Sequence, residues 1–319
     1  MKIEKINLNE DDTNVTLTTY LLDDSEEMLI GKSRPAVLIC PGGGYMFTSD
    51  REAEPLALRF ASMGYHAFVL RYSVFSNSGL AFPDPKKDAI YMNSTYPNPI
   101  REIGKALLII NEHAEEWKVR SDQIVLSGYS AGAHNCALYC VNWNKPVITD
   151  YFNSPQEGLK PAAAILGYGV YDFELQKDFK TESADEWQVK LNDAFNFAYF
   201  GKTKVTDDLI LSSSPAQLVD KDTPPMFLWA TREDNVVSVT QTTGMAHALA
   251  MKGIPFETHI YEKGHHGLSL STQATAKSKE DIIHEVDNWI GLAETWLNNR
   301  FPLDLVEKTP IFNFEQLLD

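Results

Sequence analysis

The sequence has 319 residues, of which 44% are hydrophobic and 11% aromatic, as in an ordinary globular protein. Its formal net charge of -16 at pH 7 would repel nucleic acid and anionic membrane surfaces, so the composition excludes both as expected partners and favours a small neutral molecule. No linker-like stretch and no internal repeat divides the chain, which predicts a single domain over residues 1–319.

The N-terminal segment lacks the apolar run of a signal peptide, and no stretch is long enough to span a bilayer, so we expect a cytoplasmic protein. Three cysteines, Cys40, Cys136 and Cys140, form an odd count that suits a reducing compartment. Cys136 and Cys140 lie one turn apart on a predicted helix, but partners for a tetrahedral metal site are missing nearby. We interpret them as core residues.

The first predicted elements form a β-α-β unit. A short apolar strand over residues 36–40 ends at Pro41 and three glycines. A helix follows, with Pro55 in its first turn and Gly64 at its end, and the next strand covers residues 65–72. Such a unit is typical of a parallel sheet with a helical crossover.

The same alternation continues to the end of the chain. Apolar residues recur at helical spacing from Ile100 to Trp117, and a strand follows from Gln123 to Leu126. Later strands are predicted at 162–170, 225–231 and 256–264, and later helices at 240–253 and from Asp281 to Arg300. This order predicts an α/β fold, with a mostly parallel central sheet covered by helices on both faces.

Two segments interrupt the alternation, residues 73–99 and 171–208, and both leave the ends of predicted strands. Because ligands bind at the carboxyl ends of strands in such sheets, these insertions are candidates for a cap over a binding site; ordinary surface excursions are the alternative. The C-terminal extension, residues 300–319, carries apolar side chains that could pack on the domain or contact a second copy in a homodimer.

The stretch "QIVLSGYSAGAH" places Ser130 between Gly128 and Gly132, where a predicted strand becomes a helix. A serine is a poor nucleophile unless a base removes its proton and donors stabilise the oxyanion. A sharp strand-to-helix turn would expose the hydroxyl, and glycines on either side would avoid collisions with neighbouring backbone. Alone, this pentapeptide is also compatible with a structural turn.

The remaining parts of a catalytic triad follow in the order acid, then histidine. Glu233 and Asp234 come after a late strand, and we favour the shorter Asp234; unpaired loop charges are the alternative. His265 and His266 follow the next strand, and only one of two neighbours can face a serine. We favour His266, because Gly267 leaves room for its ring. A metal-binding pair is the alternative, but no carboxylate cluster accompanies it.

The glycine loop supplies candidate donors for an oxyanion hole. Gly43 and Gly44 follow the first buried strand, and without Cβ atoms their N–H groups can approach a substrate oxygen. Ala131 opens the helix after Ser130, so its N–H group has no helical partner. A glycine turn without a ligand is the alternative. The tyrosines beside these motifs, Tyr45, Tyr129 and Tyr168, are candidate residues of the substrate pocket.

Over residues 35–296 the chain resembles the α/β-hydrolases, and within them the esterase and acetyl-xylan-esterase-like (lipase/esterase) group. The resemblance is carried by "PAVLICPGGGY", "REAEPLALRF", "GYHAFVLRYSV", "HAEEWKVRSDQIVLSGYSAGAH", "DTPPMFLWATREDNVV" and "PFETHIYEKGHHGLSL". It implies Ser130 as nucleophile with Asp234 and His266 as partners, and backbone N–H groups of the glycine loop and Ala131 as the oxyanion hole. It also implies an α/β-hydrolase fold.

These observations predict a serine carboxylesterase that hydrolyses short-chain acyl esters, such as acetyl esters of carbohydrates or small alcohols, through an acyl-enzyme. We expect neither a metal nor an organic cofactor. Two alternatives stay open. The segment "SAGAH" also resembles kynurenine formamidases, which are amidases, and a hydrolase-fold binding protein without turnover is the other. Retention of all three catalytic side chains argues against the binding protein.

Overall fold

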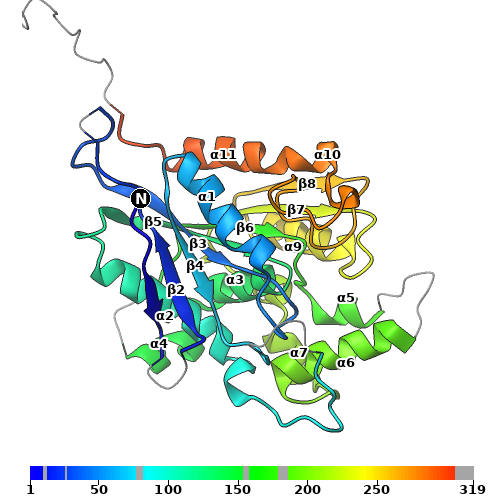
Figure 1. The fold of residues 1–319 in the computed structure, drawn as a ribbon. Helices are drawn as coiled ribbons and strands as arrows, with labels where there is room; N and C mark the ends of the chain where they lie inside the picture. The colour runs from blue at the N-terminus through cyan, green and yellow to red at the C-terminus, as the bar shows by residue number, and fades with distance from the viewer. Residues whose placement is uncertain (10–12, 26, 77–81, 154–157, 179–185, 306–319) are drawn as a thin grey trace, which may run out of the picture.

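The computed structural model describes residues 1–319 except 10–12, 26, 77–81, 154–157, 179–185 and 306–319 (Figure 1). The strands are β1 (Lys5–Asn7), β2 (Thr16–Tyr20), β3 (Arg34–Cys40), β4 (His66–Arg71), β5 (Val119–Tyr129), β6 (Ala163–Gly167), β7 (Met226–Thr231) and β8 (Phe256–Tyr261). The α-helices are α1 (Glu54–Ser62), α2 (Asn98–Glu112), α3 (Ala131–Asn142), α4 (Pro146–Phe152), α5 (Phe173–Asp178), α6 (Glu186–Phe200), α7 (Asp207–Ser212), α8 (Pro215–Leu218), α9 (Val239–Met251), α10 (His284–Asp287) and α11 (Trp289–Arg300). Shorter 3-10 helices are η1 (Asp50–Glu52), η2 (Met92–Ser94) and η4 (Lys279–Asp281).

The strands form one sheet in the order β1-β2-β4-β3-β5-β6-β7-β8. From β4 to β8 every pairing is parallel, whereas at one end of the sheet β1 pairs with β2, and β2 with β4, in antiparallel fashion. All residues of β3 and β7 are buried, as expected for parallel strands that helices cover on both sides. The prediction of a mostly parallel sheet is confirmed.

Side-chain alternation along β3 divides the core into two layers. Ala36 and Leu38 pack in the cluster that contains residues of α2, α3 and α9, whereas Val37 and Ile39 pack in the cluster that contains residues of α1 and α11. Figure 1 shows these helices on opposite faces of the sheet. The carboxyl ends of the parallel strands therefore lie between two layers of helices.

Most predicted elements lie where the sequence places them, with two differences. The helix expected from Asp281 to Arg300 is interrupted, because the Ser271 hydroxyl donates to the carbonyls of Asp281 and Ile283 and accepts the N–H of Ile283, which holds this segment out of the helix. Only α10 and α11 remain helical. The antiparallel strands β1 and β2 are not predicted by the sequence pattern.

The two insertions contact each other beside the sheet. Of residues 73–99 the structure describes all but 77–81, and of residues 171–208 all but 179–185. The Tyr96 N–H donates to the Tyr199 carbonyl at 2.8 Å, and the Ser94 hydroxyl donates to the Ala198 carbonyl at 2.9 Å. The first insertion is thereby joined to α6. Most of the predicted C-terminal extension, residues 306–319, lies outside the described residues.

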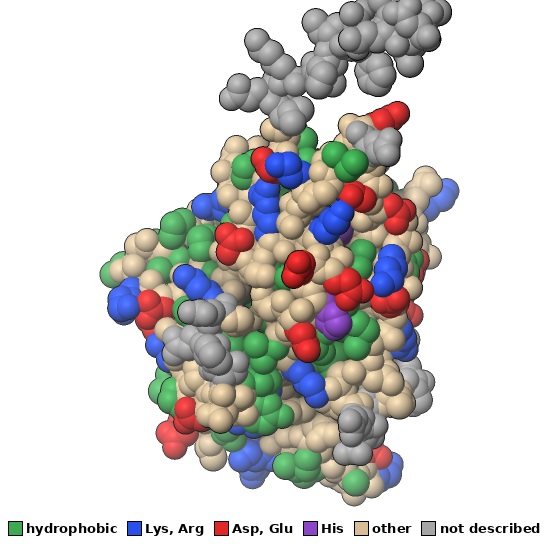
Figure 2. Space-filling model, turned by 90° about the vertical axis from the view of Figure 1, so that its left-hand side faces the viewer, with side chains coloured by type: hydrophobic (Ala, Val, Ile, Leu, Met, Phe, Trp, Pro, Cys, Tyr) green, Lys and Arg blue, Asp and Glu red, His purple; other side chains and the backbone are tan. Residues whose placement is uncertain are grey.

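All three cysteines are free and fully buried, which confirms their interpretation as core residues. Within the described part of the chain, no helix combines the length and the apolar character needed to cross a membrane. On the face shown in Figure 2, lysine and arginine side chains lie among acidic and hydrophobic ones, so the acidic excess forms no continuous surface there. The homodimer and the cytoplasmic location stay predictions.

Candidate active site

Ser130 lies on the turn between β5 and α3 in a strained backbone conformation, with φ 53° and ψ -120°. Its N–H donates to the Gly167 carbonyl at 2.9 Å, which ties the turn to β6. A Cβ at position 128 would lie 2.3 Å from the Gly132 carbonyl oxygen, and one at position 132 only 1.9 Å from the Cys40 carbonyl oxygen. Both flanking glycines are therefore required by close backbone packing, as predicted.

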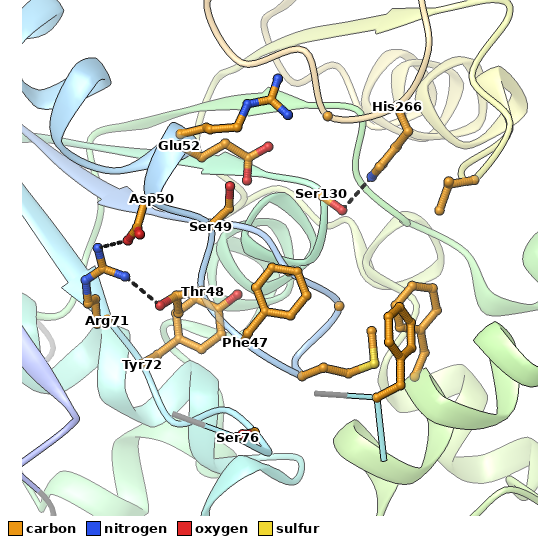
Figure 3. Close-up of a pocket in the computed structure, with 18 of the residues that line it drawn as sticks. Phe47, Thr48, Ser49, Asp50, Glu52, Arg71, Tyr72, Ser76, Ser130 and His266 are labelled. Atoms are coloured by element: carbon orange, nitrogen blue, oxygen red, sulfur yellow. Dashed lines mark hydrogen bonds and ion pairs between the residues drawn. The ribbon is translucent and has the colours of Figure 1, made fainter. Parts of the chain in front are cut away.

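Three side chains from the ends of three strands form a continuous hydrogen-bonded row. Ser130 Oγ lies 2.8 Å from Nε2 of His266, and Nδ1 of His266 lies 2.7 Å from Oδ2 of Asp234. Figure 3 shows the first of these contacts at one wall of the pocket. Asp234 follows β7 and His266 follows β8, so the parallel strand order brings both to the end of β5. The structure thus brings the predicted triad together.

The neighbours of these residues face other partners. His265 lies 3.0 Å from Oδ1 of Asp281 through Nε2, and its Nδ1 lies 2.9 Å from the His266 carbonyl oxygen. Glu233 is exposed, whereas the Asp234 side chain is fully buried. The choice of Asp234 and His266 over their neighbours therefore agrees with the placement of all four side chains.

The environment of His266 favours its protonated form. Burial lowers the pKa of His266, but the charge and hydrogen bond of Asp234, together with the charge of Glu52, outweigh burial and raise the pKa above its ordinary value. Asp234 is itself held by the N–H groups of Val236 and Val237, which donate to Oδ1 at 2.8 and 2.9 Å. The carboxylate is therefore fixed in the orientation that supports an imidazolium ion.

The glycine loop after β3 presents free N–H groups beside the serine. Gly43 and Gly44 have φ of 124° and 63°, a backbone region that favours glycine. The Gly43 carbonyl accepts the N–H groups of Met46 and Phe47, which closes the loop. Within the described residues, no hydrogen bond uses the N–H of Gly43 or Gly44, and the N–H of Ala131 lies in the first turn of α3, where helical partners are lacking. These groups can donate to an oxyanion.

Two cavities meet at Ser130. The larger, of about 620 Å³, has a wall of polar side chains from the loop before η1, from η1 and from β4, including Thr48, Asp50 and Arg71 (Figure 3). The smaller, of about 120 Å³, is mainly aromatic and aliphatic, and its lining includes Phe173. Four residues line both cavities: Gly44, Ser130, Phe195 and Val236.

The three predicted pocket tyrosines have different environments. Tyr45 lines the smaller cavity, and its hydroxyl lies 2.6 Å from Nδ1 of His134. Tyr129 and Tyr168 line neither of these two cavities, which corrects the prediction for both. The Tyr129 side chain is buried on the face of the sheet that α1 and α11 cover, and its hydroxyl lies 2.8 Å from that of Ser127. The Tyr168 ring packs against the His266 ring in an edge-on arrangement, with ring centres 5.2 Å apart.

Glu52 is a site residue that the sequence analysis does not identify. It lines the larger cavity beside Ser130, yet it is only 3% exposed. Its Oε2 accepts the Gly42 N–H at 2.8 Å, and its Oε1 accepts the Tyr168 hydroxyl at 2.7 Å. The only signal in the sequence is its position, ten residues after the first glycine of the loop and just before a helix.

Structures of known proteins are similar to this chain. The carboxylesterase Cest-2923 from Lactobacillus plantarum WCFS1 is 27% identical, with a TM-score of 0.76 over 96% of this chain and 100% of that chain. An acetyl ester-xyloside bifunctional hydrolase from Caldicellulosiruptor lactoaceticus is 26% identical, with a TM-score of 0.68 over 93% of this chain and 96% of that chain. The chain is thus similar, over almost its whole length, to structures of ester hydrolases.

Curated relatives are longer than this chain. Endo-1,4-beta-xylanase B of Butyrivibrio fibrisolvens is 28% identical over 243 residues, which are 75% of this chain and 33% of the xylanase. Across four such relatives, the matched part is 33% to 56% of the relative's length. The sequence profile of the BD-FAE family matches residues 26–249, well over half of the chain. The chain therefore belongs to the BD-FAE family and has the α/β-hydrolase fold.

Proposed function

We propose that this carboxylic ester hydrolase cleaves short-chain acyl esters, with Ser130, His266 and Asp234 as its catalytic triad. Ser130 Oγ attacks the acyl carbonyl carbon while its proton passes to Nε2 of His266. The tetrahedral intermediate then breaks the ester C–O bond, and the imidazolium returns the proton to the leaving alcohol. Water attacks the acyl-enzyme by the same route, which releases the carboxylic acid and restores the serine.

The oxyanion forms beside three backbone donors. Gly43, Gly44 and Ala131 line the cavities that meet at Ser130, and their N–H groups have no partner within the described residues that would have to be displaced. Donors that are already in place stabilise the developing charge without reorganisation, and each contributes about a hundredfold or more in rate. We assign these three groups to the oxyanion hole.

The size of the smaller cavity supports a short acyl group. Its volume of about 120 Å³ is small beside the 620 Å³ of the cavity that it adjoins. Its mainly aromatic and aliphatic wall, which includes Phe195 and Tyr199 of α6, suits the methyl or ethyl end of an acetyl or propionyl group. This cavity, opening directly at Ser130, is the observation that carries the proposed acyl preference.

The larger cavity supports a polar alcohol such as a carbohydrate. Hydroxyl, carboxylate and guanidinium groups on Thr48, Asp50 and Arg71 line it, and so do the rings of Phe47 and Tyr72 (Figure 3). Sugars combine apolar ring faces with hydroxyls, so a wall of both kinds suits them. Relatives named for xylan chemistry and for acetyl ester hydrolysis agree with this assignment.

The decisive test compares Ser130→Ala with the wild type on p-nitrophenyl acetate and acetylated xylo-oligosaccharides. We expect turnover to fall by at least about 10⁴-fold, and labelling by a fluorophosphonate probe to disappear. Ser127→Ala is the matched control, because Ser127 lies on β5, three residues before Ser130, with its hydroxyl turned to Tyr129, and it should keep both properties. Wild-type rates in Ser130→Ala would refute the triad.

Adding N-formyl-kynurenine to these substrates decides between an esterase and an amidase. N-formyl-kynurenine as the preferred substrate would identify an amidase of the kynurenine formamidase type instead of an esterase. A folded wild-type protein that neither turns over any ester nor reacts with the fluorophosphonate would be a hydrolase-fold binding protein. The complete hydrogen-bonded triad argues against that second outcome.

A further inference from the structure

We propose that Glu52 is a positioning residue for the proposed ester hydrolysis, holding the oxyanion loop with one carboxylate oxygen and, through Tyr168, the loop of the catalytic histidine with the other. This inference rests on the proposed function. Glu52 would then be a second buried carboxylate beside the triad, and the relative placement of Ser130 and His266 would depend on it.

The first tether runs from Glu52 to the oxyanion loop. Its Oε2 accepts the Gly42 N–H at 2.8 Å, directly before the two glycines assigned to the oxyanion hole. A Cβ at position 42 would lie 2.7 Å from Oε2 and 2.8 Å from the Ser130 Cβ, so the carboxylate, the loop and the serine are in tight mutual contact. Movement of Glu52 would therefore shift the oxyanion donors relative to the nucleophile.

The second tether runs to the loop that carries His266. Tyr168 donates its hydroxyl to Oε1 of Glu52 at 2.7 Å and accepts the Ser269 N–H at 3.0 Å. The Ser269 hydroxyl donates to the Arg51 carbonyl at 2.6 Å, beside Glu52 in the sequence. The Tyr168 ring also packs on His266. Arg51 and Glu52 therefore restrain the loop that carries His266 and, through Tyr168, the imidazole itself.

The hydrogen-bond pattern is that of an ionised carboxylate. Oε2 of Glu52 accepts the Gly42 N–H and Oε1 accepts the Tyr168 hydroxyl, while the Tyr168 oxygen accepts the Ser269 N–H. Burial raises the pKa of Glu52 above its ordinary value, and the hydrogen bonds from Tyr168 and Gly42 and the positive charges of His266 and Arg51 oppose this only in part. The two accepted hydrogen bonds are therefore the observation that supports the charged form.

The Glu52 carboxylate acts on His266 together with the other charged and polar groups around the imidazole. Asp234 contacts Nδ1 of the ring, Ser130 contacts Nε2, and Glu52 acts on the imidazole by its charge without a hydrogen bond. The adjacent His265 is turned to Asp281. Arg51 also reaches Asp281, with 3.7 Å between guanidinium and carboxylate. Two carboxylates thus favour the imidazolium that forms as Ser130 loses its proton.

Glu52→Gln keeps the shape of the side chain and removes its charge. We expect the acidic midpoint of kcat/KM on p-nitrophenyl acetate to move down by about 0.5 to 1 pH unit, since the pKa of His266 falls when a nearby negative charge is lost. We expect kcat on the plateau to fall about tenfold, because the weaker base and looser loop act in the transition state.

Glu102→Gln is the matched control. Glu102 is also 3% exposed, and it also accepts one backbone N–H and one hydroxyl, both from Ser73, together with the side-chain amide of Asn98, but it lines neither cavity. A general effect of losing a buried carboxylate would appear equally in both variants, whereas the pH shift should appear only in Glu52→Gln. An unshifted midpoint in a folded Glu52→Gln would overturn the proposal.

Tyr168→Phe tests the tether without touching the carboxylate. It removes the hydroxyl between Glu52 and Ser269 and keeps the ring on His266, so kcat should fall several-fold with KM within twofold of the wild type. Unchanged kcat would overturn the role of this tether even if Glu52→Gln did not fold. Retained turnover in Ser130→Ala would instead refute the proposed function, so the two failures are distinguishable.

Discussion

Oδ2 of Asp234 lies 2.7 Å from Nδ1 of His266, while Oδ1 is held by two backbone N–H groups. The carboxylate can only accept, so Nδ1 carries the proton and Nε2 is left to accept the proton of Ser130. One buried acid thus sets the tautomer of the base and stabilises its charged form. This relationship has a direct consequence for the pH dependence of the reaction.

The first prediction is that kcat/KM falls in acid with a midpoint above 6.5, the ordinary pKa of histidine. His266 has to be neutral to accept a proton, and its pKa is raised in the folded protein, so activity disappears as the pH falls through that raised value. A pH profile on p-nitrophenyl acetate measures it. Asp234→Asn should lower kcat by about 10³- to 10⁴-fold and move the midpoint down. A wild-type midpoint below 6.5 would contradict the assignment.

Much of the fold can be predicted from the sequence because its signals are local. The run over β3 ends at three glycines, and Pro55 and Gly64 bound α1 as expected. The triad is predictable because each member directly follows a strand, and parallel strands end together. The edge strands β1 and β2 escape prediction because they are short, with three and five residues, and give little periodicity.

Other parts of the site depend on tertiary contacts that the sequence pattern does not contain. Glu52 stands in "REAEPL", which is typical of the exposed first turn of a helix, and only the folded chain brings Gly42 and Tyr168 to it. Tyr129 precedes the nucleophile in sequence, but the alternation of a strand turns it to the far face of the sheet. Proximity in sequence therefore overstates its proximity to substrate.

The second prediction concerns acyl length. The wild type should hydrolyse acetate and propionate esters of p-nitrophenol far faster than octanoate, since the smaller cavity holds only about 120 Å³. Phe195→Ala removes a ring that lines both cavities and so widens the smaller one, which should raise kcat/KM for octanoate relative to acetate by about tenfold or more. Phe47→Ala is the control, because Phe47 lines only the larger cavity of the two and should leave the acyl preference unchanged. Equal rates along the series in the wild type would exclude this cavity as the acyl site.

The third prediction concerns stability in acid. His134 is buried, with Nε2 donating to the Ser213 carbonyl and Nδ1 accepting from Tyr45, and burial lowers its pKa to about 4. His134 takes up a proton near pH 6.5 in the unfolded chain but not in the folded one. The free energy of unfolding therefore falls by about 3 kcal/mol as the pH falls from 6.5 to 4. Urea unfolding of His134→Gln should show a smaller loss over this range than the wild type, while His113→Gln, at a side chain that is 41% exposed, should match the wild type. Equal pH dependence in all three proteins would contradict the neutral state of His134.

The fourth prediction compares two helical glycines. An alanine Cβ at position 132 in α3 would lie 1.9 Å from the Cys40 carbonyl oxygen and 2.6 Å from that of Pro41. Neither backbone atom can move without distorting β3 and the oxyanion loop, so Gly132→Ala should lower the free energy of unfolding by about 3 kcal/mol or more. Gly291 in α11 has no atom within 4 Å of such a Cβ, so Gly291→Ala should raise it by about 0.5 to 1 kcal/mol. Urea unfolding measures both, and a stable Gly132→Ala with full activity would show that the nucleophile turn tolerates a separation of α3 from β3.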